Sequence, residues 1–187
     1  MKRMLLHICC APCSTYVIEI LKPIYEVTGF FYNPNIHPRG QYKLRMEEMI
    51  RYAKIAGINL IIGEYDVKRW FELVNGLEDE PEGGKRCLVC YRMRLERTAQ
   101  YAASHGFDII TTTLSISPHK KADRINSIGM EIADKYGVEF LQADFKKKGG
   151  FQKSVIMSKR YNLYRQDYCG CIFSLREAER RRRKRRR

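Results

Sequence analysis

Short apolar segments alternate with longer amphipathic segments through residues 1–150 of the chain. The short segments are rich in β-branched and aromatic residues, and each has about the length of one strand. The longer segments repeat apolar residues every three or four positions, so that Trp70, Phe71 and Val74, for example, share one helix face. We expect strands at residues 4–9, 27–32, 60–65, 107–112 and 138–142, and helices at residues 14–25, 41–56, 67–74, 88–105 and 122–136.

This alternation predicts an open, doubly wound α/β fold. Strands that alternate with helices of this length form right-handed βαβ units, and their parallel sheet is covered on both faces. We therefore expect a parallel sheet of about five strands in residues 1–150, with ligands bound beyond the carboxyl ends of the strands. The alternation stops in residues 151–179, which we expect to form a helical or irregular extension before a basic tail at residues 180–187.

The charge of the chain is concentrated at one end. The 187 residues include 35 lysines and arginines and 21 acidic residues, which gives a net charge of +14. Residues 180–187 contribute eight of these positive charges, so the rest of the chain carries only +6. We expect a solvated basic tail, which either is simply disordered or also attracts RNA phosphates.

The seven cysteines carry most of the chemical information. No apolar run approaches the roughly 20 residues of a membrane span, and the apolar run at the N-terminus ends at Cys9. We therefore expect a cytoplasmic protein without membrane contact or an export signal. Stable disulfides are rare in that reducing compartment, so the thiols indicate metal or redox chemistry. They form three clusters, Cys9-Cys10-Ala11-Pro12-Cys13, Cys87-Leu88-Val89-Cys90 and Cys169-Gly170-Cys171.

The spacing of these clusters favours an iron–sulfur centre. The Cys-x-x-Cys pair can place two sulfurs on one side of a turn, and the vicinal pair at the end of the first strand adds two more. Four thiolates are the usual ligand set of a [4Fe–4S] cluster. A structural zinc site at Cys87 and Cys90, and a thioredoxin-type motif from Cys10 to Cys13, are alternatives. The third cluster is close enough in sequence to alternate between a dithiol and an easily reduced disulfide.

Four motifs in this order resemble the QueH-type epoxyqueuosine reductases. They are residues 6–14 (LHICCAPCS), 32–38 (YNPNIHP), 86–92 (RCLVCYR) and 168–171 (YCGC). The resemblance implies a fold similar to that of the nucleotide α-hydrolases. It implies a cobalamin-independent oxidoreductase that reduces epoxyqueuosine at the wobble position of tRNA to queuosine, the last step of that pathway. The basic tail lies outside the motifs.

The resemblance also implies roles for single thiols. It assigns the [4Fe–4S] cluster to Cys9, Cys10, Cys87 and Cys90, and redox activity to Cys169 and Cys171. Cys13 is then unused and can help to bind an additional iron ion, which would polarise the epoxide oxygen. The reduction consumes two electrons and two protons, so an electron donor must act as a partner. Candidate proton donors in the predicted loops are His37, His119 and Asp144, although such residues more often structure the loop.

Candidate contacts to tRNA follow the last predicted strand. Basic side chains interleave there with aromatic ones, and these types contact phosphates and stack on unpaired bases. The same aromatic residues could instead pack on the body of the protein. The candidates for RNA contact are Lys146, Lys147, Lys148, Lys153, Arg160, Tyr161 and Arg165, with Tyr164 and Tyr168 as further aromatic residues.

Three other functions share part of this pattern. A sulfonucleotide reductase also joins a cysteine pair, a distant Cys-x-x-Cys and a C-terminal cysteine, but it would have its nucleotide-binding loop where Cys9 and Cys10 lie. An ATP-dependent tRNA thiolase needs a glycine-rich phosphate loop, which Pro12 and the thiols replace. A non-catalytic metal-containing RNA-binding module would not need the pair Cys169 and Cys171. We therefore expect an epoxyqueuosine reductase.

Overall fold

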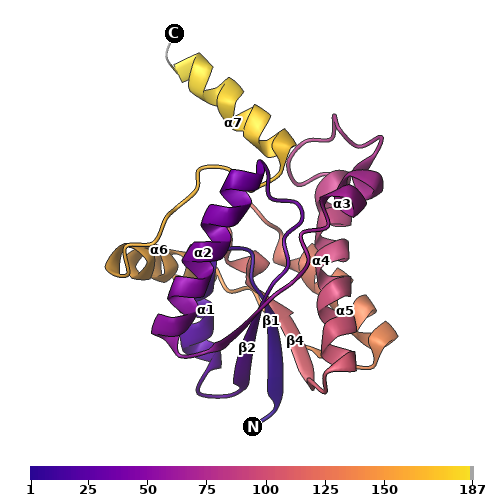
Figure 1. Cartoon of the computed structure of the whole chain (residues 1–187), viewed down its shortest axis with the longest axis vertical. Coiled ribbons are helices and arrows are strands. Elements are labelled where there is room, and N and C mark those ends of the chain that lie inside the picture. The colour runs from indigo at the N-terminus through magenta and orange to yellow at the C-terminus, as the bar shows by residue number, and fades with distance from the viewer. Residues whose placement is uncertain (186–187) are drawn as a thin grey trace.

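The structure, a computed structural model, describes residues 1–185 and contains one parallel five-stranded sheet (Figure 1). The strands are β1 (Arg3–His7), β2 (Glu26–Phe31), β3 (Asn59–Ile62), β4 (Ile109–Thr112) and β5 (Glu139–Phe140). Their order in the sheet is β3-β2-β1-β4-β5, and in the register of the central strand Leu5 lies opposite both Thr28 and Ile110. The direction of winding therefore reverses between β1 and β4, which is where open α/β sheets bind ligands.

Helices cover both faces of the sheet, as the doubly wound class requires (Figure 1). One face carries α1 (Ala11–Leu21), α2 (Arg39–Ala56) and α6 (Gly150–Arg160), and the other carries α3 (Val67–Val74), α4 (Lys85–Ser104) and α5 (Ala122–Tyr136). A short 3₁₀ helix, η1 (Thr113–Ile116), follows β4, and α7 (Ile172–Arg185) projects from the body. The predicted fold class is confirmed.

Two apolar cores lie on the two faces because successive strand residues point to opposite sides. Leu5 and Phe30 pack with α4 and α5, whereas Leu6 and Phe31 pack with α1 and α2. Within residues 1–185, no helix combines the length and the apolar content that crossing a bilayer requires.

Three helices begin earlier than the apolar pattern predicted, and for α1 and α4 this changes where the thiols lie. The helix α4 begins at Lys85 because Gly84 supplies its extended N-cap, so Cys87 as well as Cys90 lies inside its first turns. The helix α1 begins at Ala11, because Pro12 suits a first turn in which no backbone N–H is needed. Cys10 is therefore an N-cap residue and Cys13 belongs to α1.

The predicted extension, residues 151–179, consists of helical residues of α6 and α7 with an irregular segment between them, and it is joined to the body. Its first helix, α6, packs against α1, and Leu163 contributes to the core beside α1. The helix α7 continues through Arg185, so residues 180–185 are helical and not disordered, disorder being one of the two interpretations left open for the tail. Residues 186–187 of the tail lie outside the described residues. Arginine is a good helix former, and cations at the C-terminal end interact favourably with the helix dipole.

Candidate active site

A cavity of about 510 Å³ opens at the carboxyl edge of the sheet. Its wall is formed by the segments that follow β1, β2 and β4, by the segment between α6 and α7, and by α7 itself. Four of the seven thiols line it, those of Cys9, Cys10, Cys13 and Cys169. The topology thus brings thiols from both ends of the sequence to the winding reversal between β1 and β4.

Cys9, Cys10 and Cys13 form a compact thiol group at the start of α1. Their sulfur atoms lie within 4.8 Å of one another, and those of Cys9 and Cys10 are 4.0 Å apart. The hydroxyl of Thr113 in η1 accepts from the backbone N–H of Cys9 at 3.2 Å and lies 3.3 Å from its sulfur. Thiolates that share one tetrahedral metal ion, with bonds of about 2.3 Å, lie about 3.8 Å apart. The thiol group can therefore bind a metal ion.

Mutual hydrogen bonds separate the pKa values of these three thiols. The pKa of Cys9 lies well below its usual range because Cys10 and Cys13 donate hydrogen bonds to its sulfur, which outweighs burial. The hydrogen bond with Cys13 lowers the pKa of Cys10, but the hydrogen bond with Cys9 and burial raise it to about 12. Hydrogen bonds with Cys10 and Cys9, and then burial, raise the pKa of Cys13. Cys9 is thus the thiol that most readily becomes a thiolate before a metal binds.

Cys87 and Cys90 lie one turn apart on α4, close to the third cysteine cluster. Burial raises the pKa of Cys87 to about 11, and the backbone N–H of Gly83 donates to its sulfur at 3.2 Å. Burial also raises the pKa of Cys90, and the charges of Cys169 and Cys171 raise the pKa of both thiols further. Neither sulfur belongs to the compact thiol group at the start of α1.

The segment from Cys169 to Cys171 is held in place by the loop after β2 and by α2. The backbone N–H of His37 donates to the carbonyl of Gly170 at 2.7 Å, and the N–H of Ile172 donates to Nδ1 of His37 at 3.2 Å. Arg45, buried on α2, donates to the carbonyl of Cys169 at 2.8 Å. The N–H of Ser174 donates to the sulfur of Cys171 at 3.3 Å. These contacts fix the Cys-x-Cys pair at the start of α7.

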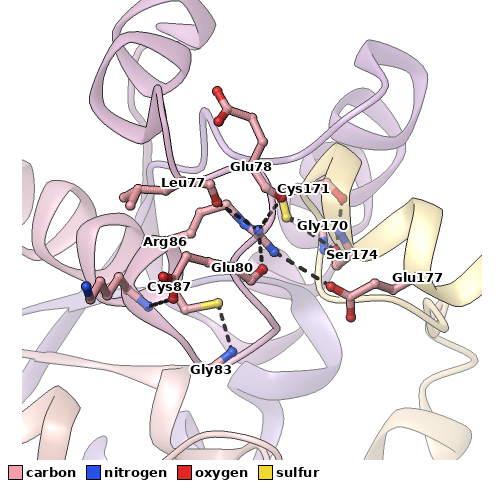
Figure 2. A network of polar contacts seen from close by, with 11 residues as sticks. Leu77, Glu78, Glu80, Gly83, Arg86, Cys87, Gly170, Cys171, Ser174 and Glu177 are labelled. Carbon is pink, nitrogen blue, oxygen red and sulfur yellow. Dashed lines mark hydrogen bonds and ion pairs between the residues drawn. The ribbon is translucent and has the colours of Figure 1, made fainter.

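Arg86 connects the start of α4 with α7 (Figure 2). Its buried guanidinium donates to three carbonyl oxygens of the loop before α4, those of Leu77, Glu78 and Glu80. It also lies 3.8 Å from the carboxylate of Glu177 on α7 and 4.7 Å from the ring centroid of Phe173. Arg86 therefore holds the segment that bears Cys87 against the helix that begins after Cys171.

Two cations in the cavity wall, Arg94 and Lys120, face this set of thiols. Arg94 is buried, and its Nε donates to the carbonyl of Cys90 at 3.2 Å. Within residues 1–185 neither cation forms an ion pair with a carboxylate. Burial lowers the pKa of each, but negative charge on the neighbouring thiols outweighs burial and raises both pKa values above their usual range. The cavity thus favours an anionic group, such as a metal bound by thiolates.

The three candidate proton donors occupy different environments. Nε2 of His37 lies 3.1 Å from the carbonyl of Pro34 while its Nδ1 accepts from Ile172, so its ring structures the loop, as the alternative interpretation stated. His119 is exposed in the cavity wall. Asp144 lies outside this cavity and pairs with Lys146 at 2.7 Å.

Some of the candidate RNA-contacting side chains are exposed, whereas others contact residues of the protein itself. Lys147, Lys148, Lys153, Arg160 and Arg165 are exposed, and Arg165 also lines the cavity, whereas Lys146 is partly buried beside Asp144. The ring of Tyr161 packs against Tyr52 with 5.4 Å between centroids, and Tyr168 is buried with its hydroxyl bonded to the carbonyl of His37. These two tyrosines therefore pack on the body of the protein, which was the alternative to stacking on RNA bases.

Sequence reasoning missed several cavity residues. Arg94 lies one helical turn after Cys90, so the i, i+4 spacing could have placed it beside the thiols. Asn33 and Asn35 lie inside the recognised YNPNIHP motif but received no role. The arginines of α7 that line the cavity, Arg181, Arg182 and Arg185, could not be placed because the sequence assigned the tail no secondary structure.

Acid should destabilise the protein through two buried histidines, His7 and His37. Burial lowers the pKa of each to about 4, against roughly 6.5 in an unfolded chain. Between these values the unfolded chain binds protons that the folded chain excludes, so the free energy of unfolding falls as the pH falls. The loss is at most about 1.4 kcal/mol per pH unit for each histidine.

Urea unfolding of the reduced, metal-free protein, compared at about pH 7 and at several values down to about pH 4, measures this loss. A His37→Gln variant should show a shallower decline than the unchanged protein. A decline of equal steepness in both would contradict the assignment to His37.

The comparison with solved structures supports the fold. A predicted subunit of a tRNA methyltransferase from Methanocaldococcus jannaschii matches 84% of this chain and 76% of its own chain, with a TM-score of 0.53 and 16% sequence identity. At this identity the likeness concerns the fold alone, and it agrees with the doubly wound architecture.

The comparison with sequences identifies the family. The family model described as epoxyqueuosine reductase QueH matches residues 4–177. An epoxyqueuosine reductase QueH of Haemophilus influenzae is 47% identical over 178 residues, which cover 94% of this chain and 73% of that protein. The protein of the same name from Thermotoga maritima is 42% identical over 183 residues, which cover 95% of this chain and 92% of that protein. The chain therefore belongs to the epoxyqueuosine reductase QueH family.

Proposed function

We propose that the chain is a cobalamin-independent epoxyqueuosine reductase that acts in the cytoplasm. It reduces epoxyqueuosine at the wobble position of tRNA to queuosine, which completes queuosine biosynthesis, in agreement with its family. The observation that carries the proposal is the convergence of three distant cysteine clusters at one edge of the sheet. Such a set of free thiols suits a reduction and is not required for binding RNA alone.

In this proposal Cys9, Cys10, Cys87 and Cys90 bind a [4Fe–4S] cluster. Two observations support the fit of this chain to such a group: the thiols come from rigid elements, and Arg94 and Lys120 supply positive charge without carboxylate partners in the described chain. Bound there with an additional iron ion beside Cys13, the cluster would supply electrons singly and the ion would polarise the epoxide oxygen.

Cys169 and Cys171 form the proposed redox-active pair. Conversion of the epoxide to an alkene consumes two electrons and two protons and releases water. Oxidation of two thiols to a disulfide releases two electrons and two protons, so the two half-reactions balance. An external reductant, which is the proposed electron-donor partner, then restores the dithiol by exchange. Cys169 lines the cavity, and Arg45 fixes its backbone there.

The proposed RNA surface combines exposed lysines and arginines from two parts of the chain after β5, namely residues 147–160 and the helix α7. Lys147, Lys148, Lys153 and Arg160 attract phosphates from one segment, and α7 adds a run of exposed arginines. Lys146 and Arg165 lie closer to the body. We assign Tyr161 a packing role at this surface, because its ring lies on Tyr52.

Removal of residues 180–187 should weaken tRNA binding and flatten its salt dependence. Each phosphate contact contributes roughly 0.7 to 0.9 to the slope of log affinity against log salt. The single-turnover rate at saturating tRNA should not change, because arginine side chains transfer no electrons. Filter binding at several salt concentrations measures the slope. An unchanged slope would assign binding to the segment from Lys146 to Arg165 alone.

A matched pair of variants refines this test. Replacing Arg181, Arg182 and Arg185 by glutamine removes three charges from the cavity side of α7. Replacing Arg180, Arg183 and Lys184 removes three charges from its other positions. The first triple variant should lose more affinity, because its side chains line the cavity that the wobble nucleotide would enter in this proposal. An equal loss would indicate that α7 attracts RNA only through its net charge.

Incubation with tRNA from a strain that lacks epoxyqueuosine reductase tests the proposed function. The anaerobically purified protein, supplied with a chemical reductant, should convert epoxyqueuosine to queuosine without ATP. Nucleosides from the digested tRNA report the conversion. Strict dependence on ATP, or no loss of the epoxide oxygen, would refute the proposal.

A further inference from the structure

Three amide side chains in the cavity wall carry buried oxygen atoms that no described residue satisfies. Asn33 and Asn35 follow β2, are 0% and 2% exposed, and line the cavity. Gln166 lines it from the segment between α6 and α7. Within residues 1–185, Oδ1 of both asparagines and Oε1 of Gln166 accept no hydrogen bond. A buried polar atom without a partner destabilises the fold, so three of them in one cavity indicate a ligand.

The orientation of Asn33 is fixed by its other end. Its Nδ2 donates at 2.8 Å to the carbonyl of Ile8, directly before Cys9. Because the donor end is committed to a carbonyl, the oxygen is the end that is left for a ligand. The backbone beside Asn35 is also held, since the hydroxyl of Tyr65 donates to the carbonyl of Ile36 at 2.6 Å. These amides therefore lie on a rigid loop, which suits recognition.

The chemistry of these oxygens selects the kind of group that they bind. Amide oxygens accept hydrogen bonds from hydroxyl or ammonium groups and have no attraction for phosphate. Arg94 and Lys120 in the same wall favour anionic groups instead. The cavity therefore has a cationic part that suits thiolates and a hydrogen-bond-accepting part that suits a polyhydroxylated ligand. The cyclopentane ring of epoxyqueuosine bears both hydroxyl groups and the reactive epoxide.

We propose that Asn33, Asn35 and Gln166 determine specificity by accepting hydrogen bonds from the hydroxyl groups of the substrate's cyclopentane ring. This inference rests on the proposed function and adds the residues that read the ring. Their position beside Cys9, Cys13 and Cys169 in the cavity wall would hold the epoxide next to the thiols. A base without the hydroxylated ring leaves the three oxygens buried and unpaired, so it is bound less well.

Equilibrium binding to two tRNAs tests this inference with the full-length, anaerobically purified protein. One tRNA carries epoxyqueuosine at the wobble position, and the other carries 7-aminomethyl-7-deazaguanine, which has no cyclopentane ring. The unchanged protein should bind the first roughly tenfold to a hundredfold more tightly. Asn35→Leu should lower this ratio severalfold without changing affinity for the second tRNA, and Asn35→Asp, which keeps an acceptor, should retain most of the ratio.

Two further variants keep the test decisive. Asn75→Leu, at an exposed asparagine after α3, is the matched control and should leave the ratio unchanged. Gln166→Leu, at a partly buried position, should lower the ratio even if Asn35→Leu does not fold. Two results would overturn the inference: equal affinity of the unchanged protein for both tRNAs, or an affinity ratio that stays the same in the folded leucine variants. Either result is compatible with reduction of epoxyqueuosine, so the proposed function would stand. Discrimination without any reduction would refute the proposed function and not the recognition of the ring.

Discussion

Replacing Cys169 or Cys171 by serine should abolish turnover of epoxyqueuosine tRNA and leave the iron content nearly unchanged. Serine cannot form the disulfide whose formation releases two electrons and two protons. The segment should keep its position, because Arg45 and His37 hold it through backbone atoms. We expect the single-turnover rate to fall at least roughly a thousandfold, as for groups that act as a unit in the chemistry. Queuosine in digested tRNA measures the rate.

The double variant is the control for this prediction. If the two thiols act as one redox pair, replacing both should cost no more than replacing either one. Loss of most of the iron in either single variant would show that the residue is a metal ligand. Turnover that survives in either variant would show that the pair is not required for the reduction.

Replacing Cys87 or Cys90 by serine should remove the iron–sulfur cluster. Each substitution takes away one of the four proposed thiolates, and the neutral serine hydroxyl is a poor ligand for iron. The protein should still fold, because α4 also packs on the sheet through Leu95 and Ala99, far from its first turn. Iron and acid-labile sulfide should fall to a small fraction of the unchanged protein, and the visible absorbance should disappear.

Cys13→Ser is the matched control for these variants. In the proposed division of ligands it should lose only the additional iron ion and keep the cluster. The compact thiol group of Cys9, Cys10 and Cys13 allows a different division, in which α1 supplies three ligands. A colourless Cys13→Ser variant together with a brown Cys87→Ser variant would establish that division and contradict ours.

The periodicity of apolar residues was sufficient to predict the sheet and its helices. Five apolar segments correspond to β1–β5, and the amphipathic segments between them correspond to α1–α5. The helix starts were less accurate, because Gly84 and Pro12 set them by backbone geometry rather than by apolar spacing. The arginine run was assigned no secondary structure from the sequence, because it has no apolar periodicity, whereas the high helix propensity of arginine favours α7.

The chemistry of the site was predictable from thiol spacing, whereas its supporting residues were not. Cysteine clusters identify themselves in a sequence because few other functions need them at such density. Arg45 and Lys120 resemble ordinary surface residues in the sequence, and Arg86 lies in a recognised motif without an evident role. All three acquire their roles only where the chain folds around them. Asn33 belonged to a recognised motif, but its free oxygen became visible only with its partner Ile8 in place.

The central claim is that the cysteine clusters form one reductive iron–sulfur centre. The most direct test is to measure the iron and acid-labile sulfide contents of the anaerobically reconstituted protein. We predict a brown protein with about four iron atoms and about four sulfides per chain in a cubane cluster, with up to about one additional iron. A colourless protein that binds only zinc and no sulfide after reconstitution would contradict the account.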